Sequence, residues 1–178
     1  LAFEPSQKNF EIISKKNKNI KNLEILNIGL GEKKEILNFK QHFESQSSTL
    51  VKINDESNYY KRKNFYLNFF NKDKIQFYDS KVKIDRLDNI LNSLKIHYVD
   101  ILKIDTEGYD FNVIKGLGEY IKNVKYIYFE HHFHNMLIKN YTLSNIHNYL
   151  EKNNFKKVFK KKMYFRKTFE YIYLNSFF

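Results

Sequence analysis

The chain has 178 residues, of which 42% are hydrophobic, so it is long and apolar enough to fold as one domain over residues 1–178. It contains no cysteine, which excludes disulfide bonds and thiolate metal sites, and no apolar run nears the roughly 18 residues that cross a bilayer. The net charge is +11, but Arg62, Arg86 and Arg166 are the only arginines among 31 basic residues. Arginine recognises phosphate better than lysine does. We therefore expect a cytoplasmic protein without a membrane span and without specific nucleic-acid binding.

The first forty residues alternate between apolar and polar segments. Residues 1–4 form an apolar run that Pro5 ends, which predicts a strand, and a weak apolar stripe predicts a helix over residues 6–18. Residues 23–30 predict a second, buried strand. Residues 34–39 predict a third strand, which we expect to form a hairpin with the second.

The segment 41–79 is polar and has no clear period, apart from an aromatic and basic stretch at residues 59–70. Loops of this length often act as lids or binding segments. We therefore expect 41–79 to be an insertion or lid that selects the substrate, with 59–70 as a helix or as part of a cover over the sheet.

Strands and helices alternate again from residue 81 onward. The predicted strands cover residues 81–84, 99–105 and 124–133, and the predicted helices cover residues 87–94, 110–121 and 142–150. Two final strands, at 156–159 and 169–174, leave no room for a crossover helix and should be antiparallel. The pattern predicts an α/β fold, with helices on both faces of a mostly parallel sheet and an antiparallel hairpin at its C-terminal end.

Two carboxylates, Asp105 and Glu107, follow directly after the apolar strand at 99–105, and Gly108 comes next. Ligands of open α/β sheets bind beyond the carboxyl ends of the strands, so these acids can serve as a general base or as ligands of a substrate or metal. The alternative is structural: Asp105 could cap the following helix, and Glu107 could favour its positive end.

Glu4 stands at the end of the first strand. An acid at such a position accepts hydrogen bonds from ribose hydroxyls in dinucleotide and nucleoside sites. It could instead cap the helix that begins near Ser6.

The strand at 124–133 ends in a polar cluster. Alternation along a strand places Glu130, His132 and His134 on one side and His131 and Phe133 on the other. The first three could bind a transition metal, as in a metal-dependent hydrolase, and a His–Glu pair could move a proton near neutral pH. The alternative is a polar strand end with solvated histidines, and we expect no metal.

The run at residues 156–167 interleaves lysines with aromatic residues. Such a run can bind single-stranded nucleic acid or an anionic surface. Lysines on a peripheral hairpin more often prevent edge-to-edge pairing.

Several of these segments together resemble the FkbM family of S-adenosylmethionine-dependent methyltransferases. The residues that carry the resemblance are, in chain order, Ala2-Phe3-Glu4-Pro5, residues 26–31, the Leu87-Asp88 helix start, Leu102-Lys103-Ile104-Asp105-Thr106-Glu107-Gly108 and residues 128–131. The resemblance extends over roughly residues 1–130, apart from the aromatic insertion. It implies a Rossmann-like class I methyltransferase sheet.

The resemblance also implies an activity and a cofactor. The activity is O-methylation of a hydroxyl on a sugar or secondary metabolite, with S-adenosylmethionine as the methyl donor. The implied cofactor-binding residues are Glu4 and Pro5 near the ribose, Asn27, Ile28 and Gly29 near the adenine, and Asp105. Asp105 is also the first candidate for the base or substrate anchor, and the other catalytic candidates are Glu107, Glu130 and His132.

In one respect the chain departs from the family pattern. The family's first strand and glycine-rich cofactor loop should precede Leu1, so we expect a fragment whose sheet lacks that strand and which is inactive alone. The alternative function is a non-catalytic binding module with a decayed cofactor site and a basic C-terminal hairpin.

Overall fold

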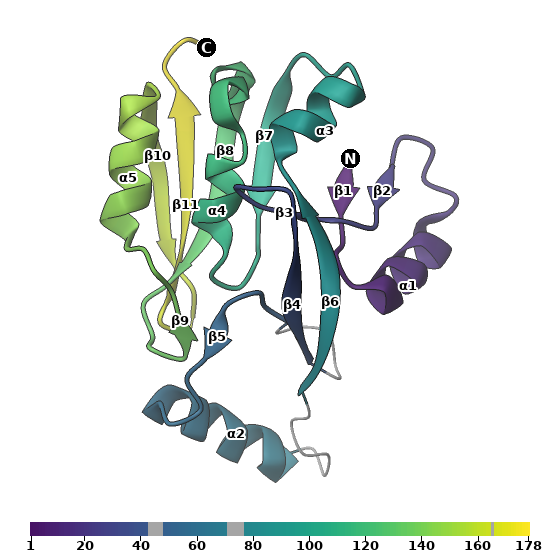
Figure 1. Cartoon of the computed structure of the whole chain (residues 1–178). Helices are drawn as coiled ribbons and strands as arrows, with labels where there is room; N and C mark the ends of the chain where they lie inside the picture. The colour runs from purple at the N-terminus through teal and green to yellow at the C-terminus, as the bar shows by residue number, and fades with distance from the viewer. Residues whose placement is uncertain (43–47, 71–76, 165) are drawn as a thin grey trace.

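A computed structural model describes residues 1–42, 48–70, 77–164 and 166–178 of the chain (Figure 1). The described strands form four separate sheets rather than one. Three of the strand pairs are parallel and four are antiparallel. The fold is therefore mixed α/β, and the single, mostly parallel sheet expected from the sequence is not seen in these parts of the chain.

The largest sheet has the strand order β10-β11-β8-β7. Strands β7 (Val99–Ile104) and β8 (Val124–His132) are parallel. Strand β11 (Thr168–Asn175) runs antiparallel to both β8 and β10 (Phe155–Lys162), which confirms the predicted C-terminal hairpin. Strand β7 pairs with β8 along one edge and with no other described strand along its second edge.

One face of this sheet carries the main hydrophobic core. Its helical side consists of α3 (Leu87–Ser93), α4 (Asp110–Lys115), the 3₁₀ helix η1 (Gly118–Asn123) and α5 (Leu143–Lys152) (Figure 1). The largest side chains buried in it are Phe129, Phe155, Tyr171 and Tyr173. Burial of each large apolar side chain contributes about 1.5–3 kcal/mol, so this core fixes β8 against β11. On the other face Ile101 is 64% exposed, so the predicted cover of helices is absent at that point.

The N-terminal strands form smaller sheets. Strands β1 (Ala2–Phe3) and β2 (Ile25–Leu26) pair in parallel, and α1 (Gln7–Asn17) connects them. The strand predicted at residues 23–30 is broken after β2 and resumes as β3 (Gly29–Leu30). This break separates the two strands into different sheets.

The third sheet has β6 (Phe77–Asp85) at its centre. Strand β4 (Glu35–His42) pairs antiparallel with β6 along its whole length, and β3 pairs in parallel with the end of β6. The predicted hairpin between residues 23–30 and 34–39 is therefore wrong, because the antiparallel partner of β4 comes much later in the chain.

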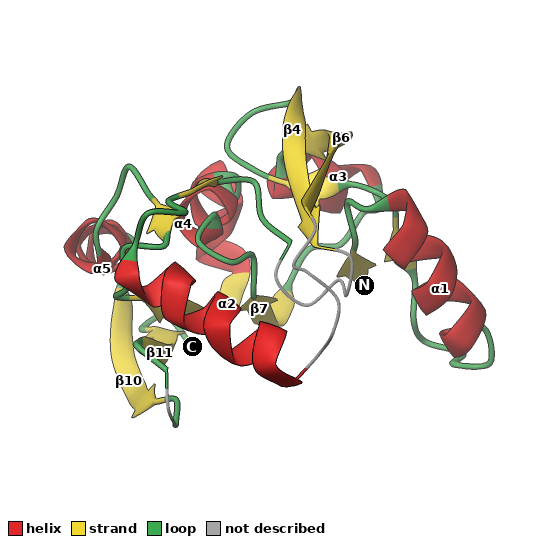
Figure 2. Cartoon of the chain, turned by 90° about the horizontal axis from the view of Figure 1, so that it is seen from below, coloured by secondary structure: helices red, strands yellow, loops and turns green. Residues whose placement is uncertain are grey.

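Residues 48–70 lie at the end of the molecule where β8 ends (Figure 1). Strand β5 (Lys52–Ile53) pairs antiparallel with β9 (Leu137–Ile138), and α2 (Asn58–Phe70) follows. Figure 2, seen from below, shows α2 running across this end. The helix predicted at residues 59–70 is thus confirmed, while residues 43–47 and 71–76 of the expected insertion lie outside the described residues. Among the described helices, none has the length and apolar character that a membrane crossing requires.

Candidate active site

The chain makes a tight turn directly after β7, at Glu107 and Gly108. Their φ angles are 48° and 95°, both in the left-handed region. Glycine adopts this region freely, whereas a glutamate there is strained by about 1–3 kcal/mol. Neighbouring groups must therefore hold Glu107 in this conformation.

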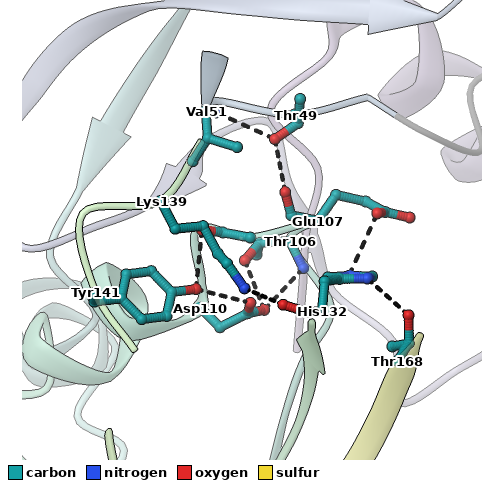
Figure 3. Close-up of polar contacts among 10 residues, drawn as sticks. Thr49, Val51, Thr106, Glu107, Asp110, His132, Lys139, Tyr141 and Thr168 are labelled. Atoms are coloured by element: carbon teal, nitrogen blue, oxygen red, sulfur yellow. Dashed lines mark hydrogen bonds and ion pairs between the residues drawn. The ribbon is translucent and has the colours of Figure 1, made fainter. Parts of the chain in front are cut away.

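A buried carboxylate, that of Asp110, holds one side of the turn (Figure 3). It accepts hydrogen bonds from the backbone N–H of Thr106 at 3.2 Å and from the Thr106 hydroxyl at 2.9 Å. The Tyr141 hydroxyl donates to the Gly108 carbonyl oxygen at 2.9 Å and lies 3.3 Å from Asp110 Oδ2. Burial raises the pKa of Asp110 to about 6. Asp110 thus fixes the turn from inside the protein.

Two residues that are distant from this turn in the sequence hold the region from other elements (Figure 3). The hydroxyl of Thr49 donates to the backbone carbonyl oxygen of Glu107 at 2.8 Å and accepts from the backbone N–H of Val51 at 3.1 Å. The ammonium group of Lys139 donates to the backbone carbonyl oxygen of His132. Since Thr49 precedes β5 and Lys139 follows β9, the β5–β9 pair connects the insertion to the turn.

The side chains of Glu107 and His132 meet in front of this turn. Glu107 Oε2 lies 3.4 Å from His132 Nε2, and His132 Nδ1 lies 2.9 Å from Thr168 Oγ1. The His132 residue is 5% exposed, whereas the Glu107 side chain is 23% exposed. Burial, together with the neighbouring positive groups, lowers the pKa of His132 to about 3. The ring is therefore neutral near neutral pH, and the pair is not an ion pair there.

The other histidines of the cluster are buried as well, so the alternative of solvated histidines is wrong. The predicted alternation of side chains along β8 is confirmed. The ring centroids of His131 and Phe133 are 4.8 Å apart, and those of His132 and His134 are 5.2 Å apart. The His134 ring stacks on Tyr59 of α2 at 4.1 Å. Among the described residues no group of three potential ligands could hold a metal ion, so the metal-dependent hydrolase gains no support.

The remaining catalytic candidates are Asp105 and Glu130. Asp105 is exposed, and it does not cap the next helix, since Tyr109 is the N-cap residue of α4 and makes no capping bond with its side chain. Glu130 is 8% exposed. Burial raises the pKa of Glu130, and the charges of Asp105 and Glu170 raise it further. Asp105 and Glu130 are therefore close enough for their charges to interact.

The structure brings together most of the residues expected at the cofactor. The side-chain amide of Asn27 donates to the carbonyl oxygen of Glu4 at 2.9 Å and reaches that of Pro5 at 3.4 Å. Gly29 is packed by the protein itself, because a Cβ there would lie 2.5 Å from Ile84 and 3.2 Å from Pro5. Ile28 is partly buried, and its backbone N–H donates to the carbonyl oxygen of Leu26.

The Glu4 carboxylate has a local structural contact. Its Oε1 accepts a hydrogen bond from the backbone N–H of Ser6 at 2.8 Å, while the Ser6 hydroxyl caps α1 through the N–H of Asn9. Burial raises the pKa of Glu4 despite these bonds. The alternative that Glu4 caps α1 is therefore wrong, because Ser6 is the N-cap residue, although Glu4 bonds to the backbone of that cap.

A groove of about 560 Å³ opens beside these residues. Pro5 and Asn27 line it together with the first turns of α1 and with β6. Its wall combines charged and polar groups, among them Lys8, Glu11 and Ser80. Two of the predicted cofactor residues, Pro5 and Asn27, therefore border this groove, and most of its other lining residues were not singled out by the sequence analysis.

Several residues of the site carry no signal that sequence reasoning detected: Thr49, Asp110, Lys139, Tyr141 and Thr168. Asp110 could have been found, because it stands three residues after Glu107 at the start of the predicted helix. Thr168 could not, because its contact with His132 depends on the register between β8 and β11.

A comparison with family models identifies the family of the chain. A model of the methyltransferase FkbM domain matches residues 1–157 of the chain. No curated protein matches the chain, and neither does any solved structure. The matched residues include Glu4, Glu107 and His132, and the match ends before Thr168. Because the match covers most of the 178 residues, the chain belongs to the FkbM methyltransferase family.

Proposed function

We propose that this domain takes part in the transfer of a methyl group from S-adenosylmethionine to a hydroxyl of a sugar or secondary metabolite. One observation carries the proposal: the Glu107 carboxylate is partly exposed at the carboxyl end of β7, in a strained turn and 3.4 Å from a neutral histidine. A hydroxyl that becomes an ether must lose its proton, and a positioned carboxylate can accept it.

The N-terminal residues that the sequence predicts at the cofactor suit a nucleoside, and two of them line the groove. A half-buried carboxylate at the end of β1 matches the hydrogen-bonding needs of ribose hydroxyls, and Glu4 has this position and burial. Pro5 and Asn27 border the groove, so they would lie next to the base or ribose. Gly29 would serve packing rather than contact with the cofactor, since Ile84 occupies the place of its missing side chain.

When bound, S-adenosylmethionine would supply an electrophilic methyl group on a positively charged sulfur. Glu107 would accept the proton of the acceptor hydroxyl as the hydroxyl oxygen forms its bond to the methyl carbon and the bond from that carbon to sulfur breaks, with its electron pair staying on sulfur. Asp105 and Glu130 would hold neighbouring hydroxyls of the acceptor. Most of the acceleration would come from the alignment of the reacting atoms, as in other reactions that bring two substrates together.

The family's first strand would pair with the second edge of β7. This edge has no partner among the described strands, and its neighbour β8 is parallel to it, which supports a further parallel strand there. We propose that such a strand, followed by a glycine-rich loop, completes the cofactor site. Binding experiments should therefore use the full-length protein.

Calorimetric titration with S-adenosylmethionine tests the assignment of Glu4. We expect Glu4→Gln to raise Kd about tenfold or more, which is about 1.4 kcal/mol of binding free energy, because the ribose loses a charged acceptor. Glu11→Gln is the control: it removes the same charge from a residue that lines the groove and should leave Kd within about twofold. Equal affinities for the wild type and Glu4→Gln would refute the ribose contact.

One observation favours the alternative of a non-catalytic binding module. Strand β10 has the sequence FKKVFKKK, its residues after Phe155 are exposed, and Tyr164 beyond it is 83% exposed. A basic surface of this kind can attract an anionic partner. If the full-length protein neither binds S-adenosylmethionine nor transfers its radiolabelled methyl group to any hydroxyl acceptor, the binding module is the better description.

A further inference from the structure

Thr168 lies directly opposite His132 in the β8–β11 register, on a part of the chain that the family model does not cover. Opposite residues on antiparallel strands point to the same face of the sheet, so the two side chains are neighbours. Thr168 is 1% exposed, and its Oγ1 lies 2.9 Å from His132 Nδ1. The hairpin β10–β11 therefore supplies a residue to the site built around Glu107.

The direction of this hydrogen bond follows from the surroundings of Thr168. Among the described residues, His132 Nδ1 is the one partner of the buried hydroxyl. If Nδ1 carried the ring proton, the hydroxyl oxygen would accept a hydrogen bond from Nδ1. The hydroxyl's own hydrogen would then be buried without an acceptor, at a cost of about 1–3 kcal/mol. The hydroxyl therefore donates to Nδ1, and the ring carries its proton on Nε2.

The other ring nitrogen lies near Glu107. His132 Nε2 is buried and, within the described parts of the chain, has no bond that meets hydrogen-bond geometry, although Glu107 Oε2 lies 3.4 Å away. A protonated Nε2 places a positive N–H hydrogen near this carboxylate oxygen, whereas a bare Nε2 would place a lone pair near a negative charge. The tautomer protonated on Nε2 therefore fits both the Thr168 hydroxyl at Nδ1 and the Glu107 carboxylate near Nε2.

We propose that Thr168 holds His132 in the tautomer protonated on Nε2, and that His132 in turn positions the Glu107 carboxylate as the proton acceptor. Thr168 and His132 are then positioning residues, and Glu107 is the catalytic residue that touches the substrate. The part of this inference that concerns catalysis rests on the proposed function, but the tautomer does not. His132 does not itself take the proton in this arrangement, because the nitrogen near the carboxylate already carries one.

The tautomer can be read directly by NMR. In protein labelled with ¹⁵N at the histidine rings, long-range ¹H–¹⁵N spectra distinguish a ring protonated on Nε2 from one protonated on Nδ1, and the signals that disappear in His132→Gln identify His132. We expect the wild type and Thr168→Ser to show Nε2 protonated and Nδ1 bare. Thr168→Val, which removes the hydroxyl at similar volume, should shift the ring toward a mixture of tautomers. A wild-type ring protonated on Nδ1, or on both nitrogens, at neutral pH would overturn the proposal, and this result does not require that Thr168→Val folds.

The positioning role of His132 can be tested by turnover of the full-length protein. A glutamine at position 132 keeps an N–H near the place of Nε2 but cannot act as a base. We expect His132→Gln to retain kcat within about tenfold, and His132→Ala to lose at least tenfold more than His132→Gln. Equal losses in both variants would contradict the positioning role. If the wild type shows no methyl transfer at all, the proposed function fails, while the tautomer is still decided by the spectra.

Discussion

The hydroxyl of Thr49 donates a hydrogen bond to the backbone carbonyl oxygen of Glu107 at 2.8 Å. The two residues are 58 positions apart in the sequence, and Thr49 is 1% exposed. The segment that was expected to act as an insertion therefore supports the turn that carries the proposed proton acceptor. The contact of Thr49 with Glu107 gives the segment 41–79 a structural role, separate from the expected role in substrate selection.

Replacement of Thr49 tests this support. We expect Thr49→Val to lower the free energy of unfolding by about 1–3 kcal/mol, because it leaves the Glu107 carbonyl oxygen and the Val51 N–H without their buried partner. Thr49→Ser keeps the hydroxyl and should lose less. Chemical denaturation measures the change, and hydrogen exchange should show faster exchange at residues 106–108 in Thr49→Val. Unchanged exchange there would show that other contacts are sufficient to hold the turn.

The strained backbone of Glu107 predicts an unusual pair of variants. Glu107→Ala and Glu107→Gly both remove the carboxylate, so both should abolish methyl transfer if Glu107 accepts the proton. At a φ of 48° glycine is unstrained and alanine is not. We therefore expect Glu107→Gly to be more stable than Glu107→Ala by about 1 kcal/mol, although glycine usually weakens a fold. Denaturation of the two variants decides this, and a more stable alanine variant would mean that the turn relaxes.

The buried histidines predict loss of stability in mild acid. Burial lowers the pKa of His131 to about 4 and that of His132 to about 3, from 6.5 in both cases. The unfolded chain binds these protons below about pH 6.5 and the folded chain does not, so stability falls as the pH drops from 6.5 toward 4. The raised pKa of Asp110, about 6 instead of 3.8, acts in the opposite direction over the same range.

The balance of these effects is a net loss. Each histidine lowers the free energy of unfolding by roughly 2 kcal/mol between pH 6.5 and 4.5. Protonation of Asp110 raises it by roughly as much as one histidine lowers it. Denaturation curves at these pH values should therefore show a net fall of roughly 2 kcal/mol. His131→Gln should flatten this dependence and Asp110→Asn should steepen it. A flat profile for the wild type would show that these groups have ordinary pKa values in the folded chain.

Local patterns were sufficient for the parts of the site that lie within one strand or turn. The alternation from Glu130 to His134 correctly placed His132 and His134 on one side and His131 on the other, because side chains alternate along any strand. The apolar run before Asp105 correctly placed both acids at a strand end. The pattern could not show which acid turns toward the histidine, because that depends on the backbone conformation of Glu107.

Long-range pairing was the part that the sequence could not provide. The run at residues 23–30 predicts one strand, but the side chain of Asn27 bonds to the backbone of Glu4 and Pro5, and the strand is interrupted there. Strand β4 was expected to pair with its neighbour in sequence and pairs with β6 instead. The contact between Thr168 and His132 has the same origin, since only the register of two distant strands creates it.

The second edge of β7, which pairs with none of the described strands, affects the behaviour of the chain in solution. The unpaired backbone groups of an edge strand can form hydrogen bonds with a strand of another chain. Ile101 on β7 is 64% exposed and offers an apolar contact at this edge. Asp100 and Lys103 are the exposed charges on this strand, and charges at an edge oppose such stacking. Removal of these two charges should therefore favour association of chains through this edge.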